Sequence, residues 1–449
     1  MRFCSATLGC KVNQYDTQAI ESILTSRGHV QVAPGEGSDV CIINTCAVTA
    51  ESVRKSRQTI RRMKKLEPGA LIAVCGCFSQ LDPSTPALLG ADLVGGSGDR
   101  HEFALKIESA SGRFSSADNL GQESAPAEFS SVSAEQGSST IVSPMAIMHD
   151  NHPPVSSSRT RALMKIQDGC DNYCAYCIIP YARGRARSLS LDSAADYARQ
   201  LGEQGFREIV VTGIEISSYG KDLEGNIALI DVVRKISGAS PNVRLRLGSL
   251  DPCVVTDEFC AEMGGISSLC DHFHLSLQSG CDETLRRMGR KYNTDVVLEA
   301  VSSLRSRFPD GGITADLIVG FPGETDEEFK QTLEFIKTAA FSNMHIFPFS
   351  IREGTRAADM PNQITRDIKR GRAKIAARLA EEMASEFRLS QIGNNVEVLF
   401  ERKRGGFWTG HSGNYIEVAV KAGGSKNSVQ AVRITGVDNG FVWGEITGS

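Results

Sequence analysis

Segments typical of β-strands and α-helices alternate along this chain, and that alternation limits the possible folds more than any other feature. Near the amino terminus, apolar periodicity predicts strands at Arg2–Thr7, Val40–Asn44 and Leu71–Cys75, with helices at Asp16–Arg27 and Ala50–Leu66 between them. A repeated strand–helix–strand order builds a parallel sheet covered by helices. We therefore expect an amino-terminal parallel α/β domain.

The alternation returns in the middle of the chain, after a strand expected at 162–167. Helices then alternate with further strands, which are expected at 207–213, 243–250, 272–278, 313–319 and 344–350. About six βα units exceed a small doubly wound sheet and fall short of an eight-unit barrel. The sequence thus predicts a central partial (β/α)6 barrel, with its site at the carboxyl ends of the strands.

The remaining stretches differ in composition. Ser, Ala, Gly, Glu and Pro dominate residues 109–158, where hydrophobic periodicity is lost, and this predicts a flexible linker, with an ordered insertion near 141–148 as the alternative. Short strand signals and Gly-rich turns at 395–446 indicate a small closed β-barrel. The predicted domains are 1–108, the linker 109–158, 159–389 and 390–449.

Bulk composition is that of a globular protein. No apolar run approaches the ~20 residues of a membrane helix and no secretory signal begins the chain, so we expect a cytoplasmic protein. The net charge of -4 excludes a global attractive field for nucleic acid, so any RNA contact must rest on local basic patches. Thirteen cysteines are many for a reducing compartment and favour metal or cluster ligation.

Three cysteines lie close together in the loop after the first central strand. Cys170, Cys174 and Cys177, here called the loop triad, have the spacing C-x3-C-x2-C. Three converging thiolates suit a cubane iron–sulfur cluster, because each binds one iron and the fourth iron stays open to another ligand. A zinc site is a weaker alternative since no fourth Cys or His follows at finger spacing, and an odd number of thiols disfavours a disulfide framework.

Three further cysteines follow the predicted amino-terminal strands. Cys10, Cys46 and Cys77, here called the strand-end triad, come just after the first, second and third strand. The carboxyl ends of parallel strands share one sheet edge, so three more thiolates could converge there. The alternative is that they are inert buried cysteines, which are common in α/β domains. The cysteines within the strands are expected to be core residues: Cys4, Cys41 and Cys75.

The loop triad, with Tyr176 before its last cysteine, resembles the radical S-adenosylmethionine (SAM) signature. Its continuation IIPYARGRARS at 178–188 resembles the methylthiotransferase branch of that superfamily. The words TLGCKVNQYD, NTCAVT and GCFSQ around the strand-end triad resemble the amino-terminal domain of the same family. The resemblance covers nearly all of the chain except the linker.

This resemblance implies two [4Fe-4S] clusters, one on each cysteine triad, and SAM as co-substrate. In the family, the cluster of the loop triad cleaves SAM to a 5′-deoxyadenosyl radical. The auxiliary cluster of the strand-end triad carries the sulfur, which a second SAM methylates. All six cysteines are therefore expected to be cluster ligands essential for the reaction.

The resemblance also implies where SAM binds, because several predicted strand ends carry words that match the family, such as LGSLDP at 247–252 and DLIVGFPGET at 316–325. Taken singly these words are weak. His274 could be a cross-strand hydrogen-bonding residue, Asp316 a cap and Gln278 a satisfied core residue. Asp251 stands where the family more often has Glu. The residues expected to bind SAM are Tyr176, Gly213, Glu215, Ser249, Gln278, Arg286, Ile318 and Pro322.

The carboxy-terminal barrel resembles the TRAM module in size and position. Cations beside aromatics in its first hairpin suggest an RNA surface, although an exposed hairpin without that role is the alternative. The residues expected to contact RNA are Arg402, Lys403, Arg404 and Trp408.

Among methylthiotransferases, the amino-terminal words are most similar to the subgroup that acts on threonylcarbamoyladenosine at tRNA position 37. The resemblance implies conversion of that nucleoside to its 2-methylthio derivative, with tRNA as partner, an electron donor such as flavodoxin or ferredoxin, and a monomeric enzyme. The alternatives are methylthiolation of isopentenyladenosine in tRNA or of an aspartate in a small-subunit ribosomal protein. An alternative of another class is a non-catalytic iron–sulfur protein that binds RNA.

Overall fold

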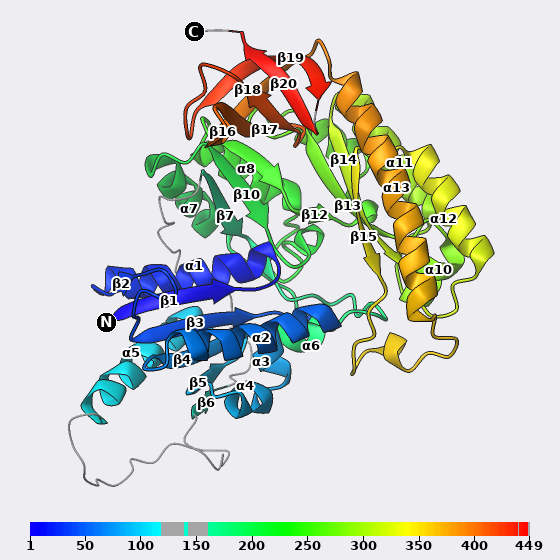
Figure 1. Cartoon of the computed structure of the whole chain (residues 1–449). Coiled ribbons are helices and arrows are strands. Elements are labelled where there is room, and N and C mark those ends of the chain that lie inside the picture. The colour runs from blue at the N-terminus through cyan, green and yellow to red at the C-terminus, as the bar shows by residue number, and fades with distance from the viewer. Residues whose placement is uncertain (118–138, 142–159, 439, 448–449) are drawn as a thin grey trace. The chain divides into compact units, whose positions relative to one another are not determined.

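The computed structural model describes residues 1–117, 139–141, 160–438 and 440–447, and these divide into two units (Figure 1). The first unit holds 1–117, 139–141, 168–172 and 177–187, and the second holds the other described residues. The loop triad is thereby divided, with Cys170 and Cys177 in the first unit and Cys174 in the second. The chain passes between the units within the short strands β8 (Gln167–Asp168) and β9 (Arg187–Ser188), and also on either side of Tyr173–Tyr176 within the loop.

A parallel sheet with helices on both faces forms the first unit. Its strand order is β2-β1-β3-β4-β5-β6. The strands are β1 (Arg2–Thr7), β2 (Val30–Gln31), β3 (Val40–Thr45), β4 (Leu71–Gly76), β5 (Leu93–Gly95) and β6 (Ser139–Ile141). The helices are α1 (Lys11–Ser26), α2 (Ala50–Leu66), α3 (Cys77–Leu81), α4 (Ser84–Leu88), α5 (Arg100–Ala117) and α6 (Ile179–Arg183). The predicted parallel α/β domain is confirmed.

Successive strand residues pack on opposite faces of this sheet. Ile42 shares one core with Ile20 of α1 and Phe103 of α5, whereas Ile43 packs against Ile60 of α2 on the other face. Because both faces are covered, β3 and β4 are buried along their whole length, which is usual for parallel strands. Cys4, Cys41 and Cys75 are among these core residues, as expected from their positions.

The segment predicted as a linker starts with regular structure instead. Helix α5 continues past the predicted boundary at residue 108, because Phe103 and Ile107 anchor it in the core and Ala110 packs against the same cluster. Ser139–Ile141 then pairs with β5 as an additional parallel strand. The rest of the predicted linker, 118–138 and 142–159, lies outside the described residues.

Parallel strands also form the central part of the second unit. One sheet has the order β11-β10-β7 and another β12-β13-β14-β15. The strands are β7 (Arg161–Lys165), β10 (Glu208–Thr212), β11 (Arg244–Leu247), β12 (Ser249–Leu250), β13 (His272–Gln278), β14 (Gly312–Val319) and β15 (Asn343–Pro348). Since Gly248 merely interrupts one predicted strand to give β11 and β12, the six expected strand positions are all present.

Helices and 3-10 turns connect these strands. The helices are α7 (Leu191–Glu203), α8 (Leu229–Ala239), α9 (Asp257–Met263), α10 (Asp282–Met288), α11 (Thr294–Arg307), α12 (Asp326–Ala339) and α13 (Arg366–Ser390). The 3-10 turns are η1 (Ile216–Ser218), η2 (Pro252–Val254) and η3 (Arg356–Ala358). Helix α12 starts with a capping box, in which Thr325 and Glu328 satisfy each other's backbone N–H groups.

A closed β-barrel completes the second unit, as predicted, with the order β16-β17-β18-β20-β19. Its strands are β16 (Asn395–Arg404), β17 (Phe407–Ser412), β18 (Glu417–Val420), β19 (Val429–Asp438) and β20 (Phe441–Ile446). Arg246 of β11 donates to the carbonyls of Ser412 and Gly413 in this barrel at 3.0 and 2.7 Å. The barrel and the central sheets are therefore joined by buried hydrogen bonds, although the sequence predicted a domain boundary at 390.

Candidate active site with two cysteine triads

The strand-end triad lies at one edge of the first unit's sheet, as predicted. Cys10 caps the amino terminus of α1 directly after β1, Cys46 follows β3, and Cys77 is the first residue of α3 after β4. Cys46 and Cys77 are buried, whereas Cys10 is exposed. Helix α1 begins at Lys11, directly after Cys10, rather than at the predicted Asp16.

Glycine is required beside two of these thiols. Gly9 has φ +97°, and a Cβ on it would come within 2.8 Å of the Cys46 Sγ. Gly76 has φ +104°, and a Cβ there would come within 2.4 Å of the Thr45 carbonyl oxygen. The strand ends can therefore approach one another only because these two positions lack a side chain.

The three thiols of this triad influence one another electrostatically. The pKa of Cys77 is raised to about 11, chiefly by burial, an effect that Arg183 opposes and that negative charge on Cys10 and Cys46 reinforces. Among the described residues, the group whose ligand atoms all lie within 4.8 Å of one another does not include these cysteines.

Arg183 is the centre of a buried hydrogen-bond network beside this triad. Its guanidinium is fully buried, and Nε donates to the Cys77 Sγ at 3.3 Å. Nη2 donates to Asn13 Oδ1 at 2.6 Å and to Asp16 Oδ2 at 3.0 Å, while Nη1 donates to both Asp168 carboxylate oxygens at 3.0 and 3.1 Å. All three guanidinium nitrogens thus have partners, which offsets the cost of burying the charge.

Asn13 is itself held in one orientation. Its Nδ2 donates to the carbonyls of Leu8 and Thr45 at 2.8 and 3.0 Å, so its Oδ1 must face Arg183. The Asn13 amide thereby connects Leu8, which follows β1, and Thr45, which ends β3, to the guanidinium of Arg183.

The network continues through further ion pairs. Arg100 contacts Asp16 at 3.3 Å, and Arg187 contacts Asp168 at 3.2 Å. Burial alone would lower the pKa of Arg183, but Asp168, Cys77 and Asp16 raise it well above its ordinary value. Three arginines and two aspartates leave one excess positive charge next to the triad, which favours thiolate ligands.

The loop triad begins in the first unit, where the backbone before Cys170 is tightly fixed. Gly169 has φ +72°, and a Cβ there would come within 1.9 Å of the Arg185 carbonyl oxygen. The Cys170 backbone N–H donates to the Gly184 carbonyl at 3.0 Å, and the Asn172 N–H donates to the Cys170 Sγ at 3.4 Å. The motif that follows the triad in sequence therefore also holds its first cysteine in place.

The middle of the loop belongs to the second unit and is pinned there by its backbone. Ala175 donates its N–H to the Met288 carbonyl and accepts from the Ala357 N–H, both at 2.8 Å. Tyr173 adopts a left-handed conformation with φ 47°, and its carbonyl accepts from Arg356. Three hydrogen bonds to two distant elements, α10 and η3, thus hold the loop in a conformation that a non-glycine residue adopts only at a cost.

Arg290 contacts Cys174 in the second unit. Its Nη1 donates to the Cys174 Sγ at 3.3 Å, Nη2 donates to Asp251 Oδ2 at 3.0 Å, and Nε donates to the Tyr292 hydroxyl at 2.9 Å. The pKa of the nearby Glu215 is raised to about 6, chiefly by burial, an effect that the charge of Asp251 reinforces and Arg290 opposes.

The other residues expected to bind SAM are distributed around the strand ends of the second unit. Tyr176 packs edge-on against Phe321 with ring centroids 6.4 Å apart, and Ile318 packs against the same cluster. Gln278 ends β13 with φ 65°. Gly213 follows β10, and a Cβ on it would come within 2.9 Å of the Gln167 carbonyl oxygen. Ser249 is exposed on β12, and Pro322 is buried after β14.

Arg286, which is also expected to bind SAM, lies on α10 with 75% of its side chain exposed and forms an ion pair with Glu283. Another arginine of this region, Arg290, contacts a cysteine of the loop triad. Sequence reasoning did not single out Arg290, nor Asn13 and Arg183 as partners of Cys77, although these two lie within the recognised words.

The residues expected to contact RNA lie on the first hairpin of the β-barrel. Arg402 and Arg404 are about half exposed and share Glu417 as a partner, at 3.1 and 4.0 Å, and Lys403 is exposed. Trp408 packs partly into the barrel core. An aromatic group that the sequence did not single out lies beside them, where Phe407 contacts Phe441 and Trp443 with ring centroids 5.4 and 5.1 Å apart.

Two family models match the chain. Residues 164–336 match the radical SAM superfamily, and residues 2–92 match a family described as Uncharacterized protein family UPF0004. Within the described part of the chain, no helix has the length and apolarity needed to cross a membrane.

Curated relatives match over most of the chain. A threonylcarbamoyladenosine tRNA methylthiotransferase (MtaB) of Bacillus subtilis is 36% identical over 92% of this chain and 89% of its own length. The protein of the same name from Thermotoga maritima is 36% identical over 88% and 85%. A tRNA-2-methylthio-N(6)-dimethylallyladenosine synthase of Caldicellulosiruptor saccharolyticus is 31% identical over 88% and 81%.

Solved structures also share the fold. The radical S-adenosylmethionine methyltransferase TsrM of Kitasatospora setae superposes with a TM-score of 0.56 at 16% identity, over 80% of this chain and 74% of its own. At this identity the similarity concerns the fold alone.

Proposed function

The chain belongs to the radical SAM methylthiotransferase family, and on that premise we propose that it converts threonylcarbamoyladenosine at tRNA position 37 to its 2-methylthio derivative. Membership makes it an enzyme and implies SAM and one [4Fe-4S] cluster. The substrate and a second cluster are parts of the proposal. A flavodoxin or ferredoxin as electron donor and a monomeric enzyme also belong to it.

The observation that carries the proposal is the strand-end triad with its buried arginine. A radical generator alone needs only the loop triad, so a second set of three cysteines requires another chemical reason. Cys10, Cys46 and Cys77 would hold the auxiliary cluster, and Cys170, Cys174 and Cys177 would hold the one that binds SAM. When bound, these clusters supply one-electron reduction and sulfur, which no protein side chain supplies.

The residues around each triad have their own tasks in this proposal. Arg183 supplies an N–H and a positive charge to Cys77, which stabilises the thiolate that a cluster requires. Arg290 does the same for Cys174 and also holds Asp251. Glu215, whose pKa is raised to about 6, is proposed to accept a hydrogen bond from an ammonium group such as that of SAM.

The threonylcarbamoyl substrate is favoured by the relatives that carry this name at 36% identity. The dimethylallyladenosine synthases at 31% identity make isopentenyladenosine the second candidate. In either case the basic hairpin of the β-barrel, with Arg402, Lys403, Arg404 and Trp408, is proposed to contact the RNA backbone and bases.

Nucleoside analysis tests the substrate directly. The chain is expressed in a bacterial host that lacks its own methylthiotransferases, and total tRNA is digested for mass spectrometry. We expect 2-methylthio-threonylcarbamoyladenosine. Its absence together with the appearance of methylthio-isopentenyladenosine would select the second candidate, and the absence of both would reject a tRNA substrate.

Iron analysis tests the two clusters. After anaerobic reconstitution we expect about eight irons per chain, as two four-iron clusters require. Cys46→Ala should retain about four irons and SAM cleavage but lose methylthiolation, and Cys174→Ala should lose SAM cleavage. Only about four irons in the unaltered protein would remove the auxiliary cluster from the proposal.

A further inference from the structure

A group of polar side chains on the second unit's sheet includes none of the triad cysteines. Phe273 of β13 packs against Phe308, which ends α11, with ring centroids 4.7 Å apart. Because strand residues alternate between faces, its neighbour His274 faces away from that helix. His274 pairs with Thr314 of β14 in the strand register, and two residues on, Asp316 pairs with His345 of β15.

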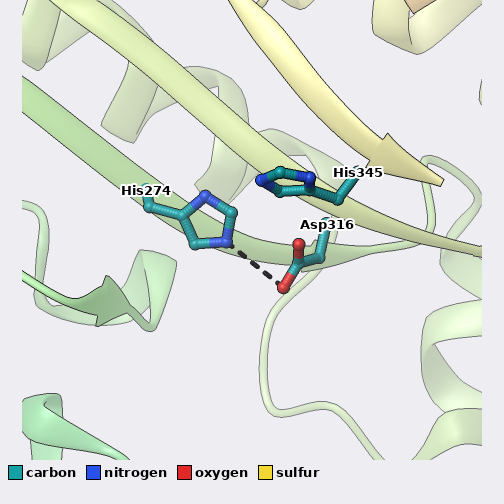
Figure 2. A group of neighbouring side chains, drawn as sticks. All are labelled: His274, Asp316 and His345. Atoms are coloured by element: carbon teal, nitrogen blue, oxygen red, sulfur yellow. Dashed lines mark ion pairs between the residues drawn. The ribbon is translucent and has the colours of Figure 1, made fainter. Parts of the chain in front are cut away.

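The three side chains from adjacent strands converge, as Figure 2 shows. The Nε2 atom of His274 lies 3.2 Å from Asp316 Oδ2, and the rings of His274 and His345 have centroids 5.8 Å apart. One ligand atom from each of the three residues lies within 4.8 Å of the other two. Two imidazoles and one carboxylate form a donor set typical of zinc and non-haem iron sites.

A hydroxyl group orients the central histidine. His274 Nδ1 lies 2.8 Å from Thr314 Oγ1, and the same oxygen lies 3.1 Å from His272 Nε2. The hydroxyl can accept an N–H from His274 and donate its own proton to His272, which leaves the lone pair of His274 Nε2 directed toward Asp316. Metal-binding histidines are usually held in this way by a hydrogen bond from their second nitrogen.

We propose that His274, Asp316 and His345 bind a divalent transition-metal ion of the Zn²⁺ or Fe²⁺ type. Three protein ligands leave one or more coordination positions open, which water or an oxygen-donor ligand such as a carboxylate or hydroxyl would fill. His345 is exposed while His274 and Asp316 are partly buried, so an ion could reach the site from solvent without unfolding the sheet. This site goes beyond the methylthiotransferase function and does not depend on it.

Zinc binding to the full chain with both clusters assembled provides the test. The protein is dialysed without oxygen against buffers of fixed free Zn²⁺, and bound zinc is measured by elemental analysis. We expect the unaltered chain to bind about one zinc more than His345→Ala and Asp316→Asn. His101→Ala, which removes a histidine from α5 in the other unit, is the matched control and should bind as much as the unaltered chain.

Zinc held by thiols is common to all these proteins and cancels in the comparison. Because His345 is exposed, its replacement should leave iron content and circular dichroism unchanged, and these readouts establish that the variant is folded. Thr314→Val keeps the side-chain shape but removes the orienting hydroxyl, so it should weaken zinc binding about 10–100-fold. Equal zinc in the unaltered chain and in folded His345→Ala and Asp316→Asn would overturn the proposal and leave a hydrogen-bonded network only. Neither tRNA nor SAM is used, so the outcome is separate from that of the nucleoside analysis.

Discussion

Two arginines donate to cysteines of the two triads at the same distance, 3.3 Å, but in different surroundings. Arg183 is fully buried and bonds Asn13, Asp16 and Asp168 besides Cys77. Arg290 retains some exposure, at 6% of its side chain, and bonds one carboxylate and one hydroxyl besides Cys174. The two arginines form similar hydrogen bonds to sulfur, but Arg183 pairs with more groups than Arg290 does.

The difference indicates separate tasks. Around Arg183, three arginines face two aspartates, so an excess positive charge lies beside the strand-end triad on side chains that are at most 16% exposed. Around Arg290, one arginine faces Asp251, and the nearby Glu215 has its pKa raised to about 6. The first environment suits a cluster that stays fixed, and the second suits a site where a charged small molecule enters and leaves.

The largest effect is expected from Arg183→Met. Removing this cation leaves Asp16 and Asp168 buried with less compensation, and breaking a buried ion pair typically costs about 3–5 kcal/mol. We expect that loss in denaturant unfolding, together with loss of the iron bound by the strand-end triad. Arg185→Met is the matched control, because Arg185 lies two residues on with 91% of its side chain exposed, and it should change stability by less than about 0.5 kcal/mol. Equal stability of the two variants would contradict the role of the network.

Arg290→Met should have a smaller effect on stability and a larger one on SAM chemistry. Loss of a partner to a cluster ligand typically lowers activity about 10–100-fold, and we expect SAM cleavage by the reduced enzyme to fall by that factor. Arg286→Met on the adjacent α10 is the comparison, because the sequence assigns Arg286 to SAM binding. SAM cleavage that is lowered by Arg286→Met but not by Arg290→Met would contradict the role proposed for Arg290.

The raised pKa of Glu215 predicts that the stability of the fold depends on pH. Its pKa is about 6 in the folded protein against an ordinary 4.5, so between these values the folded state binds the proton more tightly than the unfolded chain. The free energy of unfolding contributed by this group therefore falls as pH rises from 4.5 to 6, by at most about 2 kcal/mol, and stays constant above. Glu215→Gln should abolish this part of the pH profile in chemical denaturation. A profile unchanged by the substitution would show that Glu215 titrates normally.

Tyr173→Gly should produce the smallest effect. Tyr173 has a left-handed backbone with φ 47°, which costs a non-glycine residue about 1–2 kcal/mol. Glycine relieves that cost but loses more conformational entropy on folding, so we expect a net stabilisation below about 1 kcal/mol in thermal unfolding. A marked destabilisation would show that the aromatic side chain, rather than the backbone, holds the loop.

The elements and the positions of the triads followed from sequence because both depend on local signals. Apolar periodicity located β3 and β4, and the cysteines directly after them had to share the sheet edge. The partners of single side chains were less predictable. Arg286 and Arg290 lie four residues apart in the same stretch, and only tertiary packing decides that one pairs with Glu283 and the other with Cys174.

The partners of Arg183 could not be predicted from sequence either, for the same reason. Asp16 and Asp168 are far apart in the chain, and no periodicity relates them to the arginine that neutralises both. The helical part of the predicted linker was missed for a different reason. Its Ser- and Gly-rich composition is typical of linkers, yet α5 is anchored by Phe103 and Ile107 just before that composition begins.

Arg183 also has a consequence for synthesis on the ribosome. The first unit buries Asp16 and Asn13, but their main cationic partner is encoded far downstream, at residue 183. At typical translation rates of about 5–20 residues per second, roughly 3–13 s pass between the emergence of the end of α5 and that of Arg183. During that interval a nascent chain has its sheet but lacks the residue that completes its polar centre. A fragment ended at residue 108 would remain permanently in that state, whereas one that extends through Arg187 would contain every residue of the network.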